Sequence, residues 1–284
     1  MNKEDLKNKI ETFYIKSLNI DNPDFLITLD AVKSIIGINL DHIKINLLDW
    51  FANTIKDVDL NEYRPNNFED VPGAISFYSL ESALLDNNKK KSYESIFYLS
   101  KVSEGTQIFE FLLEFSLKHT GDCFRYIWHI MRLDRFFNGK YRIESLNRCI
   151  DVLISSDYID YIPYQSKSLL KWENYLNSKT NNVLLYYIIY NSKLIRSDCI
   201  RRLISVKLET SSMQRYPEDA INIKKEQILN GKLWINSYFD KLKIEDISLD
   251  EIILFDQIRS CLLFDRKHVD VELFWVYLNR KLCN

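Results

Sequence analysis

Six glycines and five prolines are all that this chain of 284 residues contains, and this scarcity constrains its fold more than any other feature. Average usage, at about 7% Gly and 5% Pro, would give roughly three times as many. Both residues interrupt helices and build tight turns. The sequence therefore predicts an all-α protein whose helices are joined by short polar loops. The scarcity also argues against glycine-rich sites, and no Walker-type, Gly-x-Ser-x-Gly or His-Glu-x-x-His motif occurs.

Composition indicates a large core and no strong overall charge. Hydrophobic residues make up 46% of the sequence, and the formal net charge is −2. Apolar content of this size argues against disorder. The near-neutral charge argues against nucleic acid as the main partner, because no basic field extends over the whole chain.

The cysteines and the apolar runs indicate in which cellular compartment we expect the protein. The five cysteines are odd in number and lack metal-type spacing, so we expect free thiols and no disulfide framework. No signal-peptide core follows Met1, and the longest apolar run, residues 183–190, is far shorter than the roughly 20 residues that span a bilayer. We therefore expect a cytoplasmic protein with no membrane segment. One Asp265-x-x-His268 pair is too little for a helix-bundle metal site, so no metal and no cofactor are expected.

Apolar residues recur at helical spacing along most of the chain and predict roughly a dozen helices. Several helix ends are marked by local signals. Asn22, Pro23 and Asp24 suit a first helical turn, whereas Gly37 and the pair Asn138–Gly139 suit helix ends. The run at 183–190 is consistent with a strand or with a helix buried on all sides, and the absence of a partner strand favours the helix.

A Pro- and Asn-rich stretch at 61–73 predicts a connecting loop between an N-terminal helical subdomain, 1–60, and a main helical domain, 74–284. Residues 149–155 are similar in sequence to residues 199–205, which lie 50 positions later. The same offset of 50 aligns Glu94 with Glu144. This period is slightly longer than the 40 to 47 residues of HEAT and armadillo repeats. The main domain is therefore either a repeat-like solenoid of that kind or a compact multi-helix bundle, and chance similarity between amphipathic helices explains the matches equally well.

The best candidate site is one stripe of a single predicted helix. Arg125, His129 and Arg132 follow the spacing i, i+4, i+7, so they share a face on which arginine forks suit carboxylates and phosphates. His119 lies just across the turn at Gly121, and Asp122 is expected to cap the helix. The competing interpretation is a solvated face on which Arg125 pairs with Asp122, since exposed charges on helices are ordinary.

These observations favour a non-enzymatic module that binds another protein through a helical face, as an adaptor, a scaffold or an immunity-type binder. The alternative is a helical enzyme or a protein that binds a small anionic ligand, with its site around five residues: His119, Asp122, Arg125, His129 and Arg132.

Overall fold

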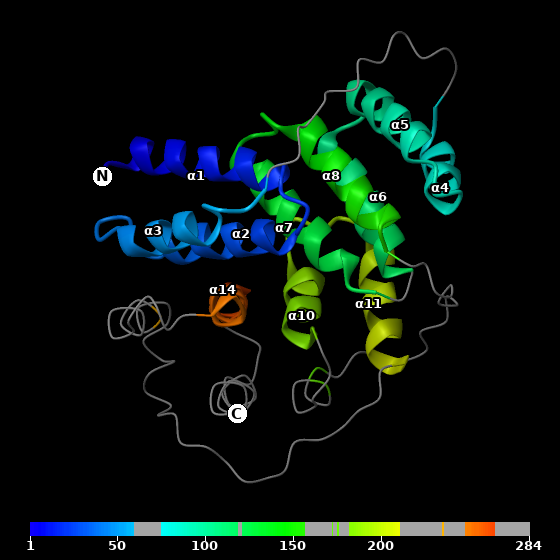
Figure 1. Ribbon diagram of the computed structural model, residues 1–284. Coiled ribbons are helices and arrows are strands. Elements are labelled where there is room, and N and C mark those ends of the chain that lie inside the picture. The colour runs from blue at the N-terminus through cyan, green and yellow to red at the C-terminus, as the bar shows by residue number, and fades with distance from the viewer. Residues whose placement is uncertain are drawn as a thin grey trace. The chain divides into compact units, whose positions relative to one another are not determined.

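The computed structural model describes residues 1–59, 75–118, 121–156, 182–210 and 248–264, together with Trp172, Tyr175 and Ile235. Every regular element in these residues is a helix, which confirms the predicted all-α class (Figure 1). The helices are α1 (Lys3–Leu18), α2 (Asp24–Ile36), α3 (Ile45–Thr54), α4 (Phe77–Leu85), α5 (Lys89–Val102), α6 (Gly105–Leu117), α7 (Cys123–Phe136), α8 (Arg142–Ile154), α10 (Val183–Asn191), α11 (Asp198–Thr210) and α14 (Leu249–Phe264). None of them is long and apolar enough to cross a membrane.

The chain divides into two compact units, the first formed by Met1–Asp30 and Leu48–Pro163 and the second by Ala31–Leu47 and Tyr164–Asn284. Compact helical packing within each unit fits a multi-helix bundle, and a solenoid is not confirmed. The predicted loop at 61–73 lies outside the described residues. The predicted division into 1–60 and 74–284 stays a prediction. Each of the two compact units instead combines two separate segments of the chain.

The first unit is built around α8, which packs against α1, α4, α5, α6 and α7. Tyr14 of α1 is fully buried against this helix, where its hydroxyl lies 2.5 Å from the Ser145 Oγ atom. Its ring stacks on Phe137 at a centroid separation of 5.1 Å. Burial raises the pKa of Tyr14 well above its ordinary value. The hydroxyl is therefore a neutral hydrogen-bonding group inside the core.

The second unit contains α10, which packs against α11 and α14. The predicted helix at 183–190 is confirmed, because α10 covers this run and its residues from Val183 to Ile189 are all buried. Arg201 of α11 donates from its guanidinium to the carbonyl oxygens of Tyr190 and Ile195, which are left at the end of α10 and in the following turn. Ser248 and Glu251 form reciprocal capping bonds at the start of α14.

Residues that match at the 50-residue offset do not occupy the same positions in their helices. Cys149 lies in the middle of α8, which begins at Arg142, whereas Cys199 is in the first turn of α11, which begins at Asp198. Cys149 is fully buried and Cys199 is partly exposed. The matched residues therefore do not support a structural repeat.

Candidate functional site

The predicted stripe lies on α7, but its members have different surroundings. His129 is 1% exposed, whereas Arg125 is only partly buried. Asp122 occupies the N-cap position, yet the prediction that its side chain caps the helix is wrong. Its backbone angles, φ −103° and ψ 13°, lie outside the extended region from which an N-cap side chain reaches the amides of the first turn. His119 lies outside the described residues.

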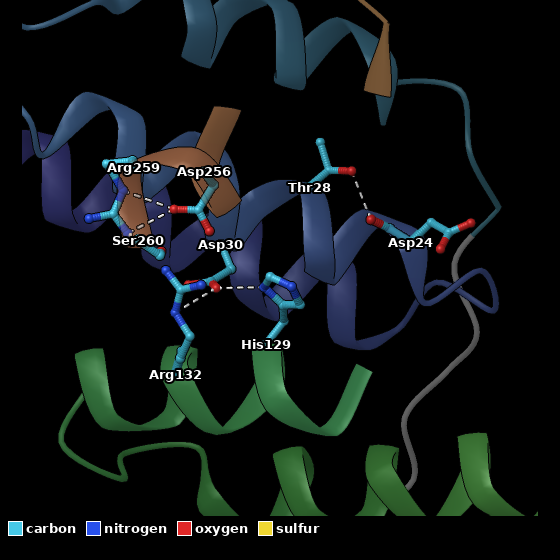
Figure 2. Close-up of polar contacts among 8 residues, drawn as sticks. All are labelled: Asp24, Thr28, Asp30, His129, Arg132, Asp256, Arg259 and Ser260. Carbon is cyan, nitrogen blue, oxygen red and sulfur yellow. Dashed lines mark hydrogen bonds and ion pairs between the residues drawn. The ribbon is translucent and has the colours of Figure 1, made fainter. Parts of the chain in front are cut away.

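His129 and Arg132 both contact a residue that the sequence did not single out, Asp30 of α2 (Figure 2). The distance from His129 Nδ1 to Asp30 Oδ2 is 2.7 Å, and the distance from Arg132 Nε to the same oxygen is 3.1 Å. The Asp30 side chain is 0% exposed and that of Arg132 is 12% exposed. These three residues form a buried polar cluster between α2 and α7 within the first unit.

A second contact joins the same two helices. The Tyr126 hydroxyl donates to Asp24 Oδ1 at 3.1 Å, one turn before His129 on α7. Partial burial, followed by the adjacent Asp24 carboxylate, raises the pKa of Tyr126 to about 12. The phenol therefore remains a neutral donor throughout the physiological range. Tyr126, His129 and Arg132 thus follow one face of α7 and bind two carboxylates of α2.

Asp30 could have been suspected from its context. It is the only charged residue in the stretch 26–32, whose other residues are all apolar except Thr28, and such a run is expected to be buried. An aspartate inside a buried helical segment requires a partner, because an isolated buried charge is strongly unfavourable. The sequence offers this signal, but it does not say which cation supplies the partner.

The cluster has the geometry by which a carboxylate orients an imidazole in catalytic dyads. A catalytic histidine must also reach its substrate. His129 is 1% exposed, and the Asp30 oxygen that it contacts also binds Arg132. The arrangement therefore suits attachment of α2 to α7 better than proton transfer to a substrate.

The other clusters of charged residues described below are also internal contacts, each between residues of the same unit. Asp134 of α7 accepts from Nε and Nη2 of Arg142, which begins α8. Glu11 of α1 accepts from Lys140 and Tyr141. In the second unit, Asp256 accepts from Nε and Nη2 of Arg259 (Figure 2). No cluster within one unit presents an exposed catalytic set in the described part of the chain.

Comparison of the chain with family models, with curated proteins and with solved structures finds no match in any of the three.

Proposed function

We propose that this protein is a non-enzymatic interaction module that binds another protein through the outward face of α4. The observation that carries the proposal is the exposure of two large apolar side chains on one helix. Tyr78 is 78% exposed and Leu85 is 55% exposed, whereas Leu80, Ala83 and Leu84 of the same helix are buried.

Tyr78, Ser82 and Leu85 follow the spacing i, i+4, i+7 and therefore lie on one face of α4. We call these three residues the α4 face. All three are exposed and none is charged, which is unusual for a helix face in contact with water. Tyrosine is enriched among residues that dominate binding energy at protein interfaces. The α4 face thus has the chemistry of an interface and lacks that of a catalytic site.

The alternative, a site for an anionic ligand around His119, Asp122, Arg125, His129 and Arg132, has less support. Two of its three described basic side chains, His129 and Arg132, already contact the buried Asp30 carboxylate. An anionic ligand at these two residues would have to compete with that carboxylate in a buried position.

Affinity purification from the producing cells tests the proposal with three forms of the full chain: wild type, the double variant Tyr78→Ser/Leu85→Ser, and Ile15→Ser as a control. Ile15 lies on α1 and is 42% exposed, so its substitution removes a comparable apolar side chain from another surface. We expect a partner that wild type and the control retain and the double variant loses. Binding of the purified partner should then weaken at least tenfold in the double variant. Equal recovery with all three forms, or no reproducible partner, would refute the proposal.

A further inference from the structure

Three consecutive lysines lie at the end of the α4 face. Lys89, Lys90 and Lys91 are the first three residues of α5, and all three are exposed. Only the short turn 86–88 separates them from Leu85, and α4 packs against α5. The apolar face of α4 therefore ends close in sequence to a cluster of positive charge, which we call the lysine corner. Figure 1 shows α4 and α5 as neighbouring helices.

The lysine corner is unfavourable for the helix that carries it. The N-terminal end of a helix has a partial positive charge and favours acidic side chains, yet the first turn of α5 contains no acid. Internal contacts offset this only in part. Lys89 Nζ lies 2.6 Å from Asp151 Oδ1, but Lys90 Nζ reaches Glu94 Oε1 only at 4.0 Å and its side chain is 83% exposed. Positions that break a local rule without evident structural gain are often functional.

We propose that the α4 face and the lysine corner together form a docking surface for an amphipathic helix of another protein, one whose apolar stripe is flanked by acidic residues. This inference rests on the function proposed above and specifies the class of partner. Tyr78 and Leu85 are two helical turns apart, about 10 Å along the axis, which matches the i, i+7 repeat of apolar residues on a partner helix. Acidic residues beside the apolar stripe of the partner helix would then contact the lysine corner.

The two halves of the surface exclude other classes of partner. Nucleic acid binding draws its affinity mainly from many phosphate contacts, whereas the lysine corner holds three cations and the net charge of −2 supplies no wider basic field. A basic helix would meet repulsion at the lysine corner. The combination of an apolar stripe and a cationic end fits an acidic amphipathic helix.

Photo-crosslinking in the producing cells tests this inference, with p-benzoylphenylalanine introduced in place of Tyr78 and, as a control, in place of Ile15. Mass spectrometry of the crosslinked peptide identifies the segment that contacts the α4 face. We expect crosslinks from position 78 to an acidic segment with helical apolar periodicity, and none to that segment from position 15. A synthetic peptide of the segment should bind the purified full chain. The variant Lys90→Glu/Lys91→Glu should weaken this binding about tenfold at low salt and less at high salt.

The outcomes separate this inference from the proposed function. A crosslinked segment that is basic or lacks apolar periodicity would overturn the acidic-helix inference and leave the interaction module standing. Unchanged peptide affinity in the lysine variant would do the same. Loss of every partner from position 78, with a partner still captured from position 15, would overturn both this inference and the role of the α4 face.

Discussion

Gly139→Ala provides the sharpest test of how the first unit is held together. Gly139 has φ +73° and lies between α7 and α8. A Cβ atom at this position would lie 2.3 Å from Nη2 of Arg142, the guanidinium that binds Asp134. Gly105 at the start of α6 approaches the same arginine, because its Cβ would lie 2.2 Å from Arg142 Nε. Two of the few glycines in this chain thus make room for one ion pair.

The expected cost has two parts. A left-handed backbone costs a residue with a Cβ about 1 kcal/mol. Displacing Arg142 leaves Asp134, which is 4% exposed, without this cation. Loss of one partner from a fully buried pair costs about 3–5 kcal/mol. The Arg142 side chain is 35% exposed, so solvent screening reduces this to about 2 kcal/mol. Gly139→Ala should therefore destabilise the protein by about 3 kcal/mol.

The change in unfolding free energy can be measured by urea denaturation, monitored by circular dichroism, for the four proteins of a double-mutant cycle. In an Arg142→Ala background the collision is absent, so Gly139→Ala should cost only about 1 kcal/mol, a coupling of about 2 kcal/mol. Gly37→Ala is the matched control, because its Cβ would meet only ordinary contacts at 3.4 Å and its φ is not positive. Strict additivity of Gly139→Ala and Arg142→Ala would refute the reasoning.

The pH dependence of the same variant provides a second check. Burial raises the pKa of Asp134 above 3.8, and the Arg142 charge partly offsets this increase. Displacing Arg142 should raise the pKa of Asp134 further. Protonated Asp134 needs no cation, so the cost of Gly139→Ala should be largest at neutral pH and should decrease as the pH is lowered toward 4. A cost that stays constant over this range would contradict the role given to the ion pair.

Three further predictions follow from the other polar contacts of the first unit. Asp30→Asn should destabilise the protein by about 3 kcal/mol in urea denaturation, because it leaves the largely buried Arg132 guanidinium without its carboxylate. Asp49→Asn, at the exposed ion pair of Asp49 with Lys9, should cost below about 1 kcal/mol. Hydrogen bonds from Lys140 and then Tyr141 lower the pKa of Glu11 below 4.5, so its contribution to stability is present above that pH and is lost as the pH falls through the lowered pKa. The difference in unfolding free energy between wild type and Glu11→Gln should therefore shrink on acidification, and a difference that grows would refute this assignment. Ultraviolet titration of wild type against Tyr126→Phe should show one phenol that ionises near pH 12, and ionisation of that phenol near 10 would contradict the contact with Asp24.

Helix ends were predictable because their signals are local. As expected, α2 begins at Asp24 after Pro23, and Gly37 directly follows its last residue. Asn138 and Gly139 both have positive φ after α7, as their residue types suggest. These positions depend on backbone sterics and on hydrogen bonds within a few residues. The surroundings of the α7 stripe were not predictable in the same way, because they depend on a helix about 100 residues away in the sequence.

The sequence by itself determined the all-α class, both ends of α2, the end of α7 and the buried nature of the run that forms α10, since propensity, capping and apolar periodicity act over one or two turns. The tertiary structure decided which side chains meet. His129 and Arg132, which by spacing alone resemble a ligand-binding stripe, contact Asp30 in the interior. Tyr78 and Leu85 are large side chains that the packing of α4 leaves exposed. Helical periodicity shows that residues share a face, whereas only the packing of distant segments determines whether that face meets another helix or water.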